Sequence, residues 1–319
     1  MSAARIGRRR RRGSGQEGVA LLLAVWLLAL LAVVAGETIF STRVRAAAER
    51  NRRDDLRGWS LAIAGYRAAL AALDDRITAV GVDEDKGDLL LYYRGDGTGT
   101  PAFAKDVALG DGTYSWRISD ESGLVPINGI QQRSVLVGVL KLCGMAPGSD
   151  RDTVVDSILD WRDVGSEHRI NGAEEDYYRS LDPPYSCKDG PLDVVEELLL
   201  VRGVTPELFF GTGEGEKRVP GLRDLLTVYS LEGEILPNAA TVPKALREEL
   251  KIARVPRGQP SRIYRIVATG DPGAGAPKRT VQAVVSRGDT GGTGGTRTFA
   301  LLYWNDTSSP EPVGREESH

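Results

Sequence analysis

The stretch that decides the fold is VALLLAVWLLALLAVVAG, residues 19–36, which contains no charged and no strongly polar side chain. A helix needs about 20 apolar residues to cross a bilayer core of ~30 Å, and about 17 is the lower limit. The run of eighteen residues is therefore long enough to span a membrane. The basic cluster Arg8 to Arg12 precedes it, and basic flanks stay in the cytoplasm, which places the chain after residue 40 on the far side.

The same residues also fit a cleaved secretory signal, with Val33, Val34 and Ala35 as a small-residue cleavage site. The sequence beyond Gly36 favours the membrane helix, because it continues without proline and is rich in good helix formers. One apolar stripe runs through it at alternating spacings of three and four residues: Leu56, Trp59, Ile63, Tyr66, Leu70 and Leu73. We predict a helix over 19–73, roughly 80 Å long at 1.5 Å per residue, whose last third packs one face on a globular body.

Beyond residue 88 the hydrophobic pattern changes from helical to strand-like. Short aromatic and β-branched runs between Gly- and Asp-rich turns predict strands at 89–94, 113–119, 261–270, 279–286 and 297–304. Between the two groups of strands, Gly and Pro separate candidate helices at 135–142, 153–161, 193–200, 206–210, 222–226 and 244–250. The strings ESGLVPIN and EGEILPN, which end at Asn128 and Asn238, are either matching strand-to-helix transitions that frame an inserted helical domain or a chance similarity.

Charge and composition argue against nucleic-acid binding and against enzymatic catalysis. The net charge of the 319 residues is −3, and residues 1–18 contribute +5, so the remainder carries −8. An acidic body is poorly suited to binding phosphates. Two His and two Cys leave little for a catalytic or zinc site, and His168, the candidate base outside the tail, lies in a charged loop. The sequence contains no G-x-S-x-G nucleophile elbow.

Eight carboxylates fall within thirty residues of the central region: Asp160, Asp163, Glu167, Glu174, Glu175, Asp176, Asp182 and Asp189. These charges repel one another unless water solvates them or a hard cation bridges them. Calcium accepts six to eight oxygens in flexible geometry, which suits an irregular acidic loop better than magnesium does. The residues alone favour a solvated acidic surface loop over a calcium site.

Cys143 and Cys187 are the two cysteines of the chain, and the predicted topology places both outside the cytoplasm. An even number of cysteines in that setting favours a disulfide. The bond would close a loop of about 44 residues around the acidic segment and stabilise the fold by roughly 3–4 kcal/mol. Two unrelated buried thiols are the alternative.

The N-terminal region resembles the precursors of type IV pilin-like proteins in three features: a basic leader, Gly18 directly before an apolar run, and a long helix with a one-sided C-terminal half. The resemblance implies that a prepilin peptidase cuts between Gly18 and Val19 and that the new N-terminal residue is methylated. Two features depart from the family. The leader of 18 residues is longer than most, and Leu23 stands at the fifth mature position, where Glu is usual. The K-type minor pseudopilins of type II secretion commonly lack that Glu.

Three central segments resemble the K-type pseudopilins closely: WRD with NGAEEDYY (161–178), PPYSCKDGPLDVVEELLLVRGVTPELFFG (183–211) and GLRDLLTVYS (221–230). This resemblance implies an α+β, pilin-like fold, in which a long helix packs on an antiparallel sheet and an all-helical domain is inserted. The expected divisions are a cleaved basic leader 1–18, a long helix 19–75 with its transmembrane part at 19–39, first strands 76–123, a helical insert 124–250, C-terminal strands 251–306 and a disordered tail 307–319.

The function implied by the resemblance is that of a minor pseudopilin of type II secretion, a non-enzymatic tip component that helps to initiate the pseudopilus. The implied partners are the I- and J-type minor pseudopilins, the major pseudopilin and the prepilin peptidase. A single pass through the inner membrane would leave the C-terminal head in the periplasm. K-type pseudopilins are known as calcium binders, which reverses the preference for a solvated loop. The expected calcium ligands are Asp160, Asp163, Glu174, Glu175 and Asp176, with carbonyls near Asn171.

A membrane-anchored DNA-binding or DNA-uptake protein is the alternative function, because DVVEELLLVRGVTPELF, residues 193–209, resembles a helix-hairpin-helix module. The hairpin V-R-G-V-T-P carries one Gly where such modules usually have G-x-G, and its flanks are acidic. Arg202 and Lys188 are the basic residues close to it, and phosphate binding depends on such residues. We interpret the segment as the same helical architecture without nucleic-acid binding.

Overall fold

The computed structural model describes residues 14–73, 76–83, 86–95, 97–130, 132–213, 215–230, 236–273, 275–288 and 298–307. Parts of the predicted features lie outside these described residues: the leader up to residue 13, residues 74–75 of the long helix 19–75, residues 232–235 of the string EGEILPN, residue 297 of the strand 297–304, and the tail from residue 308. The chain forms two compact units, residues 1–56 and 57–319.

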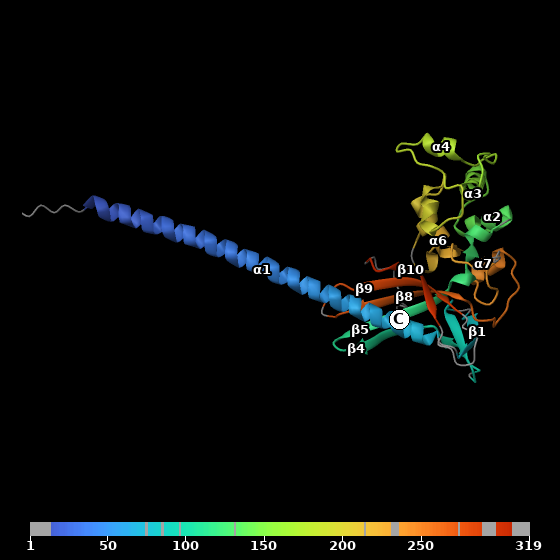
Figure 1. Ribbon diagram of the computed structural model, residues 1–319, viewed down its shortest axis with the longest axis horizontal. Helices are drawn as coiled ribbons and strands as arrows, with labels where there is room; N and C mark the ends of the chain where they lie inside the picture. The colour runs from blue at the N-terminus through green and yellow to red at the C-terminus, as the bar shows by residue number, and fades with distance from the viewer. Residues whose placement is uncertain are drawn as a thin grey trace, which may run out of the picture. The chain divides into compact units, whose positions relative to one another are not determined.

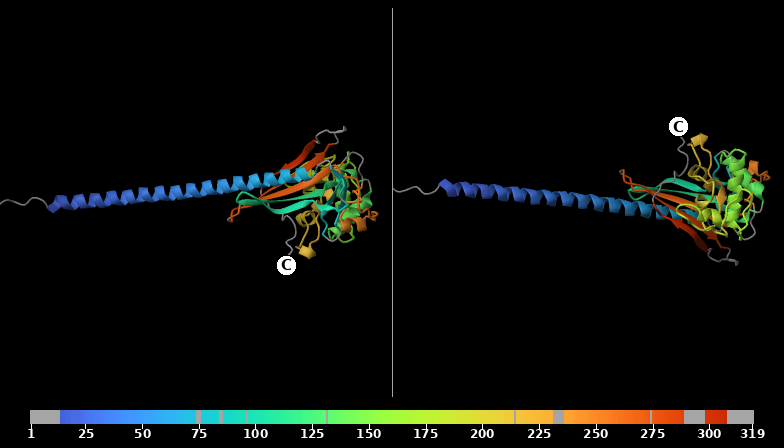
Figure 2. Two further views of the ribbon diagram at one scale, coloured as in Figure 1. Left: turned by 90° about the horizontal axis from the view of Figure 1, so that it is seen from below. Right: turned by 90° about the horizontal axis from the view of Figure 1, so that it is seen from above.

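Helix α1 (Ser14–Ala72) confirms the predicted long helix and begins five residues before the predicted start (Figure 2). Within the first unit its apolar side chains remain exposed, Leu21, Trp26 and Leu31 among them. A helix with apolar side chains exposed all round presents the kind of surface that a lipid bilayer covers. By length and composition α1 is compatible with a single-pass membrane anchor, and it is the one such helix among the described residues.

The second unit contains a five-stranded antiparallel sheet with the order β10-β9-β8-β5-β4 (Figure 1). Its strands are β4 (Phe103–Leu109), β5 (Gly112–Asp120), β8 (Ile263–Asp271), β9 (Arg279–Arg287) and β10 (Phe299–Asn305). Four of them lie where the sequence predicts strands. Strand β4 is additional, because its mostly exposed side chains lack the apolar alternation by which a strand is recognised. The early and late strands meet where β5 pairs with β8.

A smaller three-stranded sheet follows α1 and consists of β1 (Ile77–Val82), β2 (Leu89–Tyr93) and β3 (Thr100–Pro101). The sequence predicts β2 but neither of its neighbours. An antiparallel bridge between Val80 and Gly258 connects this sheet to the chain that returns from the helical region. The sheet module is therefore built from segments on both sides of the helical region.

The C-terminal end of α1, within the second unit, packs on β5 and β8. Gly270 of β8 permits the close approach, because a side chain there would collide with the backbone of Gly58 and Ala62. Tyr66 meets Trp304 of β10 edge to face, with ring centroids 5.2 Å apart. The predicted amphipathic third of the helix thus has its apolar face on the sheet.

Between β5 and β8 the chain forms a helical region, which Figure 1 shows grouped apart from the five-stranded sheet. Its α-helices are α2 (Arg133–Leu142), α3 (Ser149–Arg162), α4 (Glu175–Arg179), α5 (Pro206–Phe210), α6 (Leu222–Leu225) and α7 (Lys244–Glu249). Its 3-10 helices are η1 (Glu121–Gly123), η2 (Ile127–Gly129), η3 (Val195–Leu200) and η4 (Gly215–Lys217). A parallel pair joins β6 (Val125–Pro126) to β7 (Leu226–Thr227). The predicted helix at 193–200 is thus a 3-10 helix. Helix α4 is additional to the prediction, because its five residues are too few to show the repeat of apolar residues by which a helix is recognised.

A buried polar junction links the helical region to the sheet. Asp120, at the end of β5, accepts a hydrogen bond from the Ser122 backbone N–H (3.0 Å) and further ones from the hydroxyls of Thr241 and Ser261. Burial raises the pKa of the Asp120 carboxyl to about 6. Because Thr241 precedes α7 and Ser261 leads into β8, one carboxylate fixes both ends of the helical region to the sheet.

Candidate functional site

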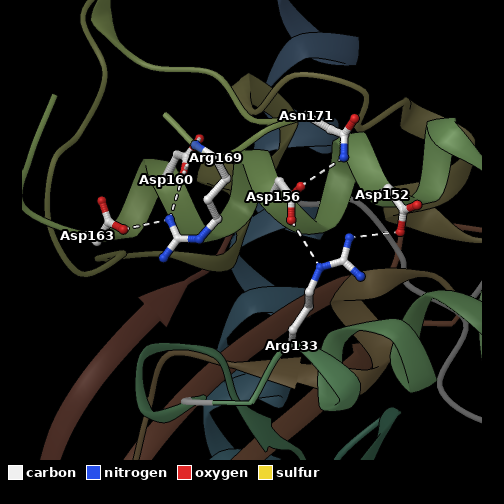
Figure 3. Close-up of polar contacts among 7 residues, drawn as sticks. All are labelled: Arg133, Asp152, Asp156, Asp160, Asp163, Arg169 and Asn171. Carbon is white, nitrogen blue, oxygen red and sulfur yellow. Dashed lines mark hydrogen bonds and ion pairs between the residues drawn. The ribbon is translucent and has the colours of Figure 1, made fainter. Parts of the chain in front are cut away.

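An acidic ridge runs along α3 and carries Asp152, Asp156, Asp160 and, at the C-cap, Asp163. Residues four apart share one helix face, so these carboxylates lie close together. Arg133 of α2 donates hydrogen bonds to Asp152 (2.8 Å) and Asp156 (3.1 Å), as Figure 3 shows. Asn171 donates to the second oxygen of Asp156 (3.1 Å). Both carboxylates of the first half of the ridge are therefore engaged by side chains of the protein.

Arg169 forms ion pairs with both carboxylates of the second half of the ridge. Its Nη1 lies 2.5 Å from Asp160 Oδ1 and 2.6 Å from Asp163 Oδ2 (Figure 3). The Arg169 backbone N–H also donates to Asp160 (3.1 Å), and a Cβ at Gly172 would overlap the Asp160 carboxylate. The structure brings two predicted calcium ligands together, as expected, but a guanidinium group already lies between them.

Two further predicted ligands belong to the first turn of α4. The Oε1 of Glu175 accepts from Arg179 Nε (2.6 Å), and its Oε2 accepts from the backbone N–H of Cys187 (2.7 Å). Hydrogen bonding to Arg179, and then to the Cys187 backbone, holds the pKa of Glu175 below its ordinary value. Asp176 is exposed to solvent. Glu175 thus links α4 to the segment around Cys187.

Glu174 differs from the other predicted ligands because it is buried and no ion pair with it is seen among the described residues. Glu174 is only 2% exposed, and apart from the weakly donating thiol of Cys187 its carboxylate oxygens have no hydrogen-bond partner. Burial, followed by the negative charges of Asp160, Asp189 and Asp163, raises the pKa of Glu174 to about 7. Burying a carboxylate with no ion-pair partner is energetically unfavourable. Among the predicted ligands, Glu174 would therefore gain most from binding a cation.

Glu174, Cys187 and Asp189 form the one cluster among the described residues that could hold a metal ion through three side chains. One potential ligand atom from each lies within 4.8 Å of the other two. Glu174 and Cys187 are buried, whereas Asp189 is exposed and left-handed, with φ of 50°. The cluster is therefore open to solvent on the side of Asp189. The sequence identifies Glu174 as a ligand and includes Asp189 in the acidic segment, but it assigns Cys187 to a disulfide.

The predicted disulfide is not formed, because Cys143 and Cys187 are both free thiols. Cys143 follows the last turn of α2 near the charge of Asp224, whereas Cys187 lies near Glu174 and Asp189. A disulfide requires Cβ atoms about 4 Å apart, and these two cysteines have different neighbours. Burial raises the pKa of each thiol to about 12. The structure corresponds to the alternative of two unrelated thiols.

The predicted peptidase cleavage site between Gly18 and Val19 lies within α1. Val19 is 57% exposed, at the start of the apolar stretch of the first unit. A continuous helix across these residues does not test whether the peptide bond is cut, so processing stays a prediction.

The hairpin that resembles a DNA-binding module engages its nearby basic residues within the protein. Arg202 donates to the carbonyl of Gly172 (3.1 Å) and lies over the Tyr177 ring, 4.7 Å from its centroid. Lys188 donates to Glu197 (2.9 Å). Both basic residues near the hairpin are thus committed to protein contacts, and the nucleic-acid alternative is not supported.

Known proteins share this architecture. Residues 128–210 match a family model described as type II secretion system protein K. The family resemblance is confirmed. The matched region extends from η2 to the end of α5 and contains the acidic ridge of α3 as well as the cluster of Glu174, Cys187 and Asp189.

One relative is a protein of Escherichia coli (strain K12) that is named, provisionally, as type II secretion system protein K. It is 28% identical over 208 residues, which cover 61% of this chain and 60% of the relative. A solved structure of similar fold is the GspK-GspI-GspJ complex from the enterotoxigenic Escherichia coli type 2 secretion system, with a TM-score of 0.54 and 15% identity. That match covers 84% of this chain and 99% of the chain in the complex, and it confirms the α+β, pilin-like fold.

Proposed function

We propose that this chain is a minor pseudopilin of type II secretion, a non-enzymatic component at the tip of the pseudopilus. The observation that carries the proposal is the match of residues 128–210 to the protein K family, in a chain that also has the long apolar helix and the sheet of that fold. The helical region suits a tip position. A bulky insertion of 142 residues between β5 and β8 would clash if every subunit of a tightly stacked filament carried it.

The proposed partners are the I- and J-type minor pseudopilins, which pair with a similar chain in the solved complex of similar fold, together with the major pseudopilin. Leu23 in place of the usual Glu supports a starting role. That Glu pairs with the terminal amine of an earlier subunit, and the first subunit has none. The α1 helix would anchor the chain in the inner membrane, with the second unit in the periplasm.

Processing by the prepilin peptidase gives a sharp test with a matched control. The test uses a strain from which the gene for this chain, not that for the peptidase, has been deleted. We expect the wild-type chain and the Gly15→Val variant to restore secretion of folded proteins there. N-terminal sequencing should show that both mature chains begin at Val19. Gly18→Val should remain uncut and fail to restore secretion, because the peptidase recognises the residue before the cut. A mature chain that begins at Gly36, or normal secretion in the deletion strain, contradicts the proposed function.

The proposed function includes calcium binding in the acidic segment, at a site built around Glu174. Both oxygens of Glu174 are buried and have no donor other than the weakly donating thiol of Cys187, which fits a cation, and exposed Asp189 supplies a further carboxylate nearby. Calcium takes six to eight oxygens, so carbonyls and water would complete the shell. Asp160 and Asp163 can join only if Arg169 gives up its ion pairs, and Glu175 is held by Arg179.

Thermal melting of the full chain in detergent, with millimolar calcium and with chelator, tests this site. Binding to the folded state stabilises it by RT ln(1 + [L]/Kd), about 2.7 kcal/mol at a hundredfold excess over Kd. We expect the shift in the wild type and in Glu167→Gln, an exposed control from the same segment. We expect its loss in Glu174→Gln. An undiminished shift in Glu174→Gln would place the calcium elsewhere.

A further inference from the structure

We propose that Cys187, Glu174 and Asp189 form a mixed thiolate–carboxylate site for a thiophilic divalent cation such as zinc or cadmium. This inference deepens the proposed cation site, and its test separates the two. Thiolates select zinc-like cations, whereas calcium takes oxygen ligands. The acidic residues alone would therefore favour calcium, and the thiol is the group that changes the choice.

The positions of the three donors suit such an ion. Zinc takes sulfur at about 2.3 Å and carboxylate oxygen at about 2.0–2.2 Å in a tetrahedral arrangement, which puts the donor atoms roughly 3.5 Å apart. The donors here lie within 4.8 Å of one another, so a contraction of about 1 Å closes the site. Asp189 can supply this movement because it is exposed, and solvent can provide the fourth ligand on the same side.

The burial of Glu174 is an independent observation in favour of a ligand. The residue is 98% removed from solvent, and apart from the weakly donating thiol of Cys187 its two oxygens lack hydrogen-bond partners. Buried polar groups are normally satisfied by the protein or by water. A cation bound by Glu174 and Cys187 would supply the missing interaction, and the thiol proton would leave to solvent as the sulfur binds the metal.

The surroundings of Cys187 hold its sulfur in position. Its backbone N–H donates to Glu175 Oε2 (2.7 Å), and Arg179 fixes the other oxygen of Glu175 (2.6 Å). Cys187 belongs to the core of the helical region, together with fully buried Tyr178. Groups that orient a ligand in this way are characteristic of metal sites. Cys143 is not part of the cluster, which makes it a matched control.

The test is a cadmium titration of the purified full chain in detergent without reductant or chelator. The readout is the ultraviolet charge-transfer absorption band of a cadmium–thiolate bond. We expect a band that saturates at one equivalent in the wild type and in Cys143→Ser, and none in Cys187→Ser. Glu174→Gln leaves the thiol and the core intact, and we expect it to weaken cadmium binding by roughly tenfold or more.

Three results would overturn the inference: no band in the wild type, a band that survives in Cys187→Ser, or unchanged affinity in Glu174→Gln. The calcium melting shift of the wild type distinguishes the two proposals. A calcium shift without a cadmium band retains the calcium site and rejects the role of Cys187. A cadmium band without a calcium shift retains the thiolate site and rejects calcium.

Discussion

The sheet module and the helical region of the second unit are held together in different ways. The sheet relies on backbone ladders, as between β5 and β8, and among the described residues its core cluster has 12 buried side chains. The helical region has short helices and a core cluster of 26 buried side chains. Its stability must therefore come from side-chain packing and from ion pairs such as those of Arg133 and Arg169. Individual residues consequently matter more there, and both proposed sites lie in that region.

The largest expected effect comes from opening a cavity in either core. Ile158 of α3 and Ile266 of β8 are both fully buried, so the same change to Ala can be compared in the two regions. Each should lower the free energy of unfolding by about 2–5 kcal/mol. Because the clusters are separate, we expect urea unfolding followed by circular dichroism to show each variant lowering mainly the transition of its own region. One shared transition for both variants would mean that the two cores form a single cooperative unit.

The next effect concerns the junction between the two regions. The folded state raises the pKa of Asp120 from 3.8 to about 6, mainly through burial, so the folded chain binds this proton more tightly than the unfolded chain. The free energy of unfolding should therefore rise as the pH falls from about 6 to about 4, by at most about 3 kcal/mol. Urea unfolding at pH 7 and pH 5 measures this. Asp120→Asn should reduce the slope and leave the part due to Glu174, whose pKa the fold also raises, to about 7, whereas exposed Asp306→Asn should keep the full slope; equal slopes in all three proteins would contradict the prediction.

A smaller effect is expected from the surface ion pair between α2 and α7. Lys141 Nζ lies 2.7 Å from Glu249 Oε2, and the Lys141 side chain is 62% exposed. Solvent screens such a pair, so Lys141→Ala should cost only about 0.2–1 kcal/mol, and less at high salt. Melting temperatures at low and high salt test it. A loss above 2 kcal/mol would show that the helical region depends on this contact far more than its core suggests.

The smallest expected effect is that of reducing agent, which should not change the melting temperature at all. Cys143 and Cys187 are free, so nothing in the helical region is cross-linked through them. Thiol titration of the chain in denaturant without reductant should give two thiols. If the titration finds no free thiol and reductant lowers the melting temperature, the two cysteines form the disulfide that their even number predicts.

Residues local in sequence predict a large part of the fold. The apolar stripe with its three- and four-residue spacing is enough to place the amphipathic end of α1, and the alternating runs are enough for β5, β8, β9 and β10. These patterns work because a helix or strand with one buried face repeats its apolar residues at its own period. The family motifs led to the proposed function: those at 161–178 and 183–210 lie within the residues that match the protein K family model, and the one at 221–230 lies beyond them.

Tertiary structure alone decided what the acidic segment can do. The sequence lists its carboxylates without showing that Arg169 forms ion pairs with Asp160 and Asp163 while Glu174 is buried without an ion pair among the described residues. It also gives no sign that Cys187 lies beside Glu174 rather than bonded to Cys143. Charge pairing and metal binding depend on distances of a few ångströms between side chains in irregular segments, where spacing along the chain does not fix which side chains meet. Only the packing of α3, α4 and the segment around Cys187 sets those distances.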